Sequence, residues 1–164
     1  MDEENPVHVR IGTPDDVFAM MTLAMNACVD NGLTNPNPRK LLADIWASLN
    51  LDHGLIGIIG MPGEEIEAMI LMRVEPMWYS DDYVLNERAI FVDPKYRSAK
   101  GGRAARLCEF AQKVQESLGV PLLIGILSTK DAEAKVRLYQ RKFGQSAGAY
   151  WVIGAKTGAW KEAN

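Results

Sequence analysis

A basic, glycine-containing loop follows a short apolar run near the middle of the chain. Its cations are Arg97, Lys100 and Arg103, and its glycines are Gly101 and Gly102. The periodic apolar residues that come next predict a helix, so the loop would present backbone N–H groups and the positive end of a helix dipole. This arrangement favours phosphate. The alternative is an ordinary helix entry whose cations face water, since glycine-rich loops are common.

The loop and the run before it resemble the central motif of the GNAT superfamily, the acyl-CoA-dependent N-acyltransferases. In that motif a strand ending in Val-x-Pro leads into Arg/Gln-x-x-Gly-x-Gly/Ala. Val92, Pro94, Arg97 and Gly102 stand at the matching positions, whereas Lys100 stands where the family usually has its first Gly. The resemblance implies that the loop holds the pyrophosphate of coenzyme A.

The same resemblance implies acetyl-CoA as co-substrate and a set of residues that would hold it. The backbone of Phe91 and Val92 would pair with the pantetheine arm like one more strand, and its N–H groups could polarise the thioester carbonyl. The loop residues of this set are Arg97, Ser98, Ala99, Lys100, Gly101, Gly102 and Arg103.

A second family segment lies near the C-terminus. The run from Leu138 to Gly144, LYQRKFG, resembles the family's Leu-Tyr-x-x-x-Gly-Phe with its last two residues inverted. By that resemblance Tyr139 lies near the thioester sulfur, and its phenol, with an ordinary pKa of about 10, gives a proton to the departing thiolate. The other interpretation is a core aromatic residue on an apolar helix stripe, and one ring can serve both roles.

An amine acceptor is protonated at neutral pH and must lose a proton before it attacks a thioester. Glu87, on the strand before the cofactor loop, is the best carboxylate to accept that proton, directly or through a water, and Asp81 and Asp82 are weaker choices. The alternative for Glu87 is a cross-strand ion pair with Arg73 or Arg88.

Aromatic residues are interleaved with acids just before that strand. Trp78, Tyr79 and Tyr83 lie beside Asp81 and Asp82, a composition that could recognise a cationic amine through ring faces and carboxylates. The alternative, which we prefer at this point, is that the rings fill a core edge and the acids form a solvated turn.

Hydrophobic periodicity predicts the elements that position these residues. Together with the resemblance, their order predicts a GNAT-like α/β fold in one domain spanning residues 1–164, with a central mixed sheet of about six to seven strands flanked by four helices. The strand, helix and strand from residue 84 to 127 should form a parallel unit. The expected strands are 7–11, 55–59, 66–74, 84–92, 121–127 (covered on both sides) and 147–153, and the expected helices are 13–31, 38–49, 103–118 and 131–143.

Composition narrows the class of protein. The 164 residues carry a net charge of −3 and a pI near 5.4, which argues against a general nucleic-acid binder. No apolar run is long enough to span a bilayer, and Cys28 and Cys108 lie in apolar helical patterns, so we expect a cytoplasmic protein with reduced thiols. His8 and His53 lack partners at ligand spacing, so we expect no metal site.

The leading hypothesis is an N-acetyltransferase that moves an acetyl group from acetyl-CoA to a primary amine of a small-molecule or protein acceptor. The competing hypothesis is a catalytically silent GNAT-fold binding or assembly protein, because Lys100 alters the loop and the C-terminal region offers one strand where the family usually has two. An open sheet edge there could give a homodimer. The segment from Glu87 to Ile153 also resembles GNAT-type proteins of bacteriophages, so a virion-associated role belongs to this alternative.

Overall fold

The computed structural model describes residues 7–97, 101–156 and 160. Its helices and strands follow the predicted order up to the last helix. In chain order they are β1 (Arg10–Ile11), η1 (Pro14–Asp16), α1 (Val17–Asn31), α2 (Pro38–Leu49), β2 (Gly54–Ile59), β3 (Ala68–Pro76), β4 (Tyr83–Val92), η2 (Pro94–Tyr96), α3 (Arg103–Leu118), β5 (Leu122–Leu123) and α4 (Ala132–Phe143).

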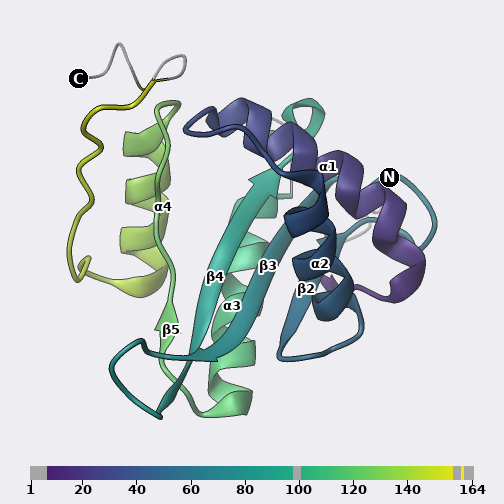
Figure 1. Ribbon diagram of the computed structural model, residues 1–164, viewed down its shortest axis with the longest axis horizontal. Helices are drawn as coiled ribbons and strands as arrows, with labels where there is room; N and C mark the ends of the chain where they lie inside the picture. The colour runs from purple at the N-terminus through teal and green to yellow at the C-terminus, as the bar shows by residue number, and fades with distance from the viewer. Residues whose placement is uncertain (1–6, 98–100, 157–159, 161–164) are drawn as a thin grey trace, which may run out of the picture.

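The five strands form one mixed sheet in the order β1-β2-β3-β4-β5. Neighbours from β1 to β4 are antiparallel, and β4 pairs with β5 in parallel, so the predicted hairpin and the predicted parallel unit are both confirmed. Helices α1 and α2 cover one face of the sheet, α3 covers the other, and α4 stands at the β5 edge (Figure 1). The described residues supply five strands, so the expected six to seven are not confirmed.

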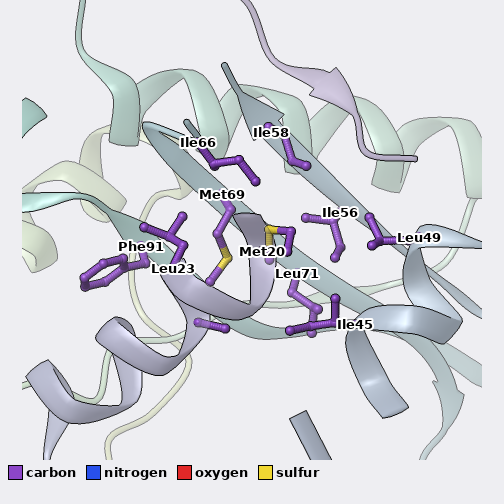
Figure 2. Packing of buried hydrophobic residues seen from close by; sticks show 11 residues of the cluster. Met20, Leu23, Ile45, Leu49, Ile56, Ile58, Ile66, Met69, Leu71 and Phe91 are labelled. Carbon is purple, nitrogen blue, oxygen red and sulfur yellow. The ribbon is translucent and has the colours of Figure 1, made fainter. Parts of the chain in front are cut away.

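Successive residues of β3 pack into the hydrophobic cores on opposite faces of the sheet. Met69 and Leu71 point to α1 and α2, where they pack with Met20 and Phe91 (Figure 2). Ile70 and its alternate neighbours point to α3. Since side chains alternate along a strand, a central strand covered on both faces must be apolar there, as residues 68–72 of β3 are.

The helix ends follow local rules that the sequence predicts. The side chain of Asn37 accepts hydrogen bonds from the backbone of Arg39 at 3.0 Å and Lys40 at 3.4 Å, which caps α2. Gly32 ends α1 with a φ of 66°, a conformation that glycine adopts at little cost. No helix in the described ranges is both long and apolar enough to cross a membrane.

The C-terminal third departs from the prediction. The run from 121 to 127 forms only the two-residue β5, and its residues alternate between half-buried and exposed, so the expected cover on both sides is wrong. Residues 147–153 were predicted as a last strand but are irregular and exposed apart from the half-buried Val152. Residues 124–127 part from β4 and so lack a hydrogen-bonded neighbour, and residues 147–153 pair with no strand of the described chain.

Candidate active site

An extra residue interrupts the ladder between β3 and β4. Leu71 pairs with Ala89, but the next residue, Met72, pairs with Glu87, so Arg88 is left over as a bulge in β4. A bulge bends its strand and increases the local twist. The bend comes just where β4 stops pairing with β5.

Strands β4 and β5 pair at only two positions in the described chain, Leu85 with Leu122 and Asn86 with Leu123. Beyond these positions a cavity of about 990 Å³ opens between the second half of β4 and residues 123–128. The end of α1, residues 34–41, the start of the β3–β4 connection, the inner side of α4 and Tyr150 also line it. This volume is at the upper end for ligand pockets, so the gap between the two strands is the candidate site.

Glu87 lies in this cavity, and burial changes its acidity. Its partner Met72 belongs to the core on the α3 face, so the carboxylate points to that side of the sheet. The backbone N–H of Gly125 donates a hydrogen bond of 3.4 Å to Oε2. Loss of solvent raises the pKa of Glu87 to about 7, outweighing the opposite effect of that bond. A carboxylate of this pKa can exchange a proton near neutral pH.

The arginines that were possible ion-pair partners of Glu87 bond elsewhere. Arg73 donates from Nη1 to Ser48 Oγ at 3.1 Å and to the carbonyl of Asp52 at 2.7 Å. Arg88 forms an ion pair with Glu75 at 2.7 Å. The ion-pair interpretation of Glu87 is therefore wrong for both arginines.

Asp81 and Asp82, the weaker candidates for the base, lie in the exposed turn between β3 and β4 and do not line the cavity. Trp78 and Tyr79 in the same connection are exposed and meet edge to face at 5.4 Å, so the prediction that they fill a core edge is wrong. Trp78 does line the cavity, whereas Tyr83 begins β4 and is partly exposed.

Tyr139 also lines the cavity, from α4, where it is half-buried, and its role as the acid remains a prediction. Its ring packs edge to face on Phe143 at 5.4 Å. Burial, followed by the charge of Glu87, raises the pKa of Tyr139 above its ordinary value. The phenol therefore keeps its proton at neutral pH. The two predicted catalytic residues, far apart in sequence, thus line the same cavity.

Cys108 lies on the α3 side of the same region. It is buried, and loss of solvent raises the pKa of its thiol to about 12. A thiol of this kind is a poor nucleophile, because the thiolate is the reactive form. Within the described residues, no group of three His, Cys, Asp or Glu side chains is placed to hold a metal ion.

The glycines of the predicted phosphate loop have backbone angles that favour glycine. Gly101 has a φ of 112°, and a Cβ added there would lie 2.5 Å from Cγ2 of Val7. Gly102 follows with a φ of 57° and begins α3. A residue with a side chain would be strained at either position. Ser98, Ala99 and Lys100, the other predicted loop residues, lie outside the described residues.

Arg97 points back over the strand end and not away into solvent. Its Nε donates to the carbonyl of Val92 at 3.0 Å, and its guanidinium carbon lies 5.0 Å from the centre of the Phe91 ring. Phe91 lines the cavity. The two residues predicted to offer their backbone to a pantetheine arm are thus held in place by the arginine of the motif.

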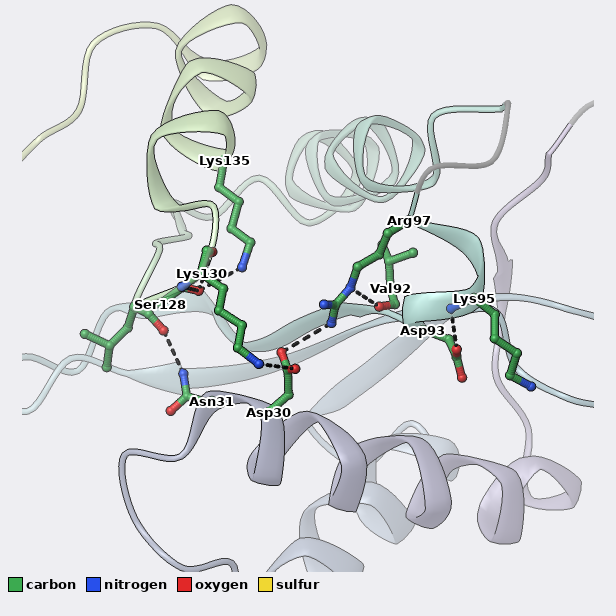
Figure 3. Close-up of polar contacts among 10 residues, drawn as sticks. Asp30, Asn31, Val92, Asp93, Lys95, Arg97, Ser128, Lys130 and Lys135 are labelled. Atoms are coloured by element: carbon green, nitrogen blue, oxygen red, sulfur yellow. Dashed lines mark hydrogen bonds and ion pairs between the residues drawn. The ribbon is translucent and has the colours of Figure 1, made fainter. Parts of the chain in front are cut away.

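A charged cluster at the end of α1 was not predicted. Asp30 accepts from Arg97 at 3.3 Å and from Lys130 at 3.2 Å, and Lys135 donates to Ser128 Oγ at 2.9 Å (Figure 3). The pKa of Asp30 is lowered, because its two cationic partners outweigh its burial. Arg97 of the predicted cofactor loop and Lys130 of the β5–α4 connection thus share the Asp30 carboxylate beside the cavity, and Lys135 of α4 bonds to Ser128 close by.

The side chain of Arg103 contacts Glu67 and Tyr96 in this structure. Its Nε donates to Glu67 Oε2 at 2.8 Å, and its guanidinium carbon lies 4.8 Å from the centre of the Tyr96 ring. Its side chain is largely buried by these contacts. A role for Arg103 in holding a phosphate remains a prediction.

The pKa of Glu87 gives a prediction for stability. Because the folded pKa of about 7 exceeds the ordinary 4.5, the folded state binds more protons between these values, and stability should fall as pH rises through this window. The difference corresponds to about 3 kcal/mol of unfolding free energy. We expect Glu87→Gln to unfold at higher urea concentration than the wild type at pH 8 and at a similar one at pH 4. If the unfolding free energies of the two proteins change in parallel between pH 4 and pH 8, the raised pKa of Glu87 is contradicted.

Neither a family sequence model nor a curated protein sequence matches the chain. Solved structures match it over nearly its whole length. The aminoglycoside N-acetyltransferase AAC(6')-Iy in complex with a bisubstrate analogue superposes with a TM-score of 0.67 at 16% identity, over 92% of this chain and 98% of that chain. The same enzyme in complex with CoA gives a TM-score of 0.65 at 16% identity, over 92% and 96%. A ribosomal-protein-alanine N-acetyltransferase from Brucella melitensis biovar Abortus 2308 gives 0.62 at 13% identity, over 90% and 97%.

The fold is therefore that of the GNAT acetyltransferases, as the motif around Arg97 predicted. Identities this low establish the fold alone, so the activity must be argued from the chain's own residues.

Proposed function

We propose that the protein is an acetyl-CoA-dependent N-acetyltransferase acting on a primary amine. The observation that carries this proposal is that Glu87 and Tyr139, a carboxylate with a pKa of about 7 and a protonated phenol, line the same cavity between the diverging strands β4 and β5. A group that is partly ionised at neutral pH can act as the base of a reaction, and a neighbouring group that stays protonated can act as its acid.

In the proposed reaction the acceptor amine first gives a proton to the Glu87 carboxylate, directly or through a water. The nitrogen lone pair then attacks the thioester carbonyl carbon, the carbon–sulfur bond breaks, and the phenol of Tyr139 gives its proton to the leaving sulfur. The nitrogen then gives its second proton to the Tyr139 phenolate, which restores the phenol, and Glu87 releases the first proton to solvent, so the products are an amide, free CoA and one proton. Backbone N–H groups of β4 beside the cavity would polarise the carbonyl.

The cofactor arm would enter along the second half of β4, which β5 leaves unpaired. Phe91 and Val92 would offer their backbone there, and Arg97 with the glycine loop at the start of α3 would hold the pyrophosphate. On ligand binding the anion would compete with Asp30 for Arg97.

The acceptor would approach from the α1–α2 side of the sheet. The cavity wall there carries Glu75, which is bonded by both Asn86 and Arg88, and the exposed ring of Trp78. A carboxylate and an aromatic face suit a cationic amine. The names of the matching enzymes include both an aminoglycoside and a ribosomal-protein acceptor, so the proposal covers small molecules and protein termini.

Cofactor binding can be tested without knowledge of the acceptor. We expect acetyl-CoA at about 100 times its Kd to stabilise the wild type by about 2.7 kcal/mol and to raise its Tm by several degrees. Arg97→Gln should weaken CoA binding about tenfold in calorimetry, because it removes one charged contact to phosphate. The matched control is Arg106→Gln, which removes an exposed arginine of α3 that pairs with Glu109. Absence of a Tm shift at saturating acetyl-CoA would contradict the cofactor assignment.

An assay for free thiol released from acetyl-CoA, run with a panel of amines, distinguishes the enzyme hypothesis from the hypothesis of a catalytically silent module. The panel should contain aminoglycosides, polyamines and short peptides with a free N-terminus. Thiol release that depends on one of these amines supports the enzyme. Binding of CoA without release for any amine would favour the silent GNAT-fold module.

A further inference from the structure

The charged side chains that line the cavity differ in what they leave open to a ligand. They are Asp30, Glu75, Glu87, Arg88 and Lys135. The carboxylate of Asp30 already accepts from two cations, and burial raises the pKa of Glu87 to about 7, so Glu87 is only partly ionised at neutral pH. Both oxygens of Glu75 accept hydrogen bonds of 2.7 Å, from Asn86 and Arg88. The carboxylates of the wall therefore offer a ligand little negative charge that is not already compensated.

Arg88, in contrast, has donors to spare. A guanidinium has five N–H donors, and one of them, on Nη2, is bonded to Oε2 of Glu75. Because Asn86 occupies the other oxygen, Glu75 does not bind the guanidinium through both oxygens. The Arg88 side chain is 43% exposed and has no further hydrogen-bond partner in the part of the chain that the structure describes. Donors of Arg88 therefore remain for a ligand in the cavity.

The guanidinium of Arg88 is also held in place. Asn86 fixes Glu75 through Oε1, and Glu75 fixes Arg88 through Oε2. Glu75 follows Val74, which packs on the α3 face of the sheet, so this chain of bonds lies on the opposite, α1 face. An exposed ion pair contributes little to stability. Hydrogen bonds that orient a binding side chain in advance lower the entropic cost of binding.

Arg88 and Glu87 are neighbours in β4 and reach the cavity from opposite faces of the sheet. Glu87 pairs with Met72 and points to the α3 side, whereas the guanidinium lies on the α1 side with Glu75. An amine that gives its proton to Glu87 in the gap between β4 and β5 would leave the rest of the acceptor on the α1 side. Arg88 is the arginine that lines the cavity on that side.

Lys135, the other cation of the wall, belongs to a different end of the cavity. Its Nζ donates to Ser128 Oγ at 2.9 Å, beside the ion pairs of Asp30 (Figure 3). Loss of solvent and the charge of Arg97 lower its pKa. Since Arg97 belongs to the predicted cofactor loop, Lys135 lies toward the cofactor and Arg88 toward the acceptor.

We propose that Arg88 selects acceptors that carry an anionic group, a carboxylate or a phosphate, in addition to their amine. This inference rests on the proposed function and names the class of acceptor for the same site. A guanidinium binds either anion through two parallel hydrogen bonds, which fixes orientation as well as affinity. The anion shares Arg88 with Glu75 or displaces it, and the exposed ring of Trp78 remains for the cationic part of the acceptor.

Matched pairs of acceptors test the proposal. β-Alanine is compared with β-alaninamide, and phosphoethanolamine with ethanolamine, so that the members of each pair differ in the anionic group. Calorimetry in the presence of CoA measures their affinity without turnover, because CoA has no acetyl group to give. In at least one pair we expect the wild type to bind the anionic member about tenfold tighter or more. The pair that shows this preference identifies the anion as a carboxylate or a phosphate.

Arg88→Gln should abolish that preference. The Kd of the anionic member should rise about 10-fold to 100-fold, while the Kd of the neutral member stays unchanged, because the variant loses a charged contact to the anion alone. In thiol-release kinetics KM should change and kcat should change little. Arg88→Lys should recover part of the affinity, since it keeps the charge but not the paired donors.

The matched control is Arg106→Gln, which removes a similarly exposed arginine that forms an ion pair with Glu109 and does not line the cavity. Circular dichroism and an unchanged Kd for CoA show that each variant is folded. A wild type without preference for the anionic member of either pair, an equal loss for both members in Arg88→Gln, or the same loss in Arg106→Gln would each overturn the proposal.

Failure of this inference can be told apart from failure of the proposed function. Thiol release by the wild type with amines that lack an anionic group, and not with the anionic members, would overturn the role of Arg88 and leave the acetyltransferase standing. Binding of an anionic amine that depends on Arg88, without thiol release, would support the role of Arg88 and contradict the enzyme.

Discussion

Replacing Glu87 by Gln is expected to lower kcat for acetyl transfer by about 10²–10⁴-fold, the usual contribution of a general base. The amide has nearly the same shape but cannot accept the acceptor's proton. In the wild type the rate should rise as pH increases through about 7, because Glu87 must be ionised to act and burial holds its pKa there. The variant should lose this part of the pH profile while keeping any part that belongs to the acceptor amine.

The matched control for this experiment is Asp81→Asn, which removes a carboxylate from the exposed β3–β4 turn and should leave kcat unchanged. Steady-state kinetics at several pH values measures both variants. If Glu87→Gln keeps the wild-type kcat, Glu87 is not the base. If only Asp81→Asn lowers kcat, the base lies in the β3–β4 turn.

Tyr139→Phe is expected to lower kcat by about 10²-fold while the KM for acetyl-CoA changes little. The substitution keeps the ring and its packing on Phe143 but removes the proton that the leaving sulfur needs. An acyl donor whose thiol has a lower pKa needs less help from an acid, so it should recover part of the lost rate.

Tyr79→Phe is the control for this tyrosine, since Tyr79 is exposed and does not line the cavity. Stability of the Tyr139 variant should be close to that of the wild type in thermal unfolding. An equal loss of rate with good and poor leaving groups would show that the phenol acts by packing and not as an acid.

Elements set by neighbouring residues could be predicted from the sequence. Asn37 caps α2 through the next few backbone N–H groups, and the glycines of the loop allow the backbone that starts α3. The alternating and continuous apolar patterns of β2, β3 and β4 similarly predicted strands that the structure contains. Tyr139 was predicted from a local motif, and Glu87 from its place on the strand before the cofactor loop; the structure places both at one cavity, and their catalytic roles remain predictions.

Features that depend on distant partners could not be predicted. Asp30 lies 67 residues from Arg97 and 100 from Lys130, and nothing in the local sequence of α1 signals that cluster. The residues from 147 to 153 have strand composition, but a strand also needs an edge that it can reach. Propensity alone therefore predicted the wrong structure for this segment in the isolated chain.

The single extra residue in β4 reverses the alternation of the strand. Leu85 and Glu87 point to the α3 face, whereas Ala89 and Phe91 point to the α1 face, although all four have odd numbers. In an uninterrupted strand the carboxylate and the Phe91 ring would share one side. With Arg88 inserted, Glu87 lies on the α3 side of the sheet, while the Phe91 ring, which contacts Arg97, lies on the α1 side. Deleting this one residue would bring both onto the same side, without altering either side chain.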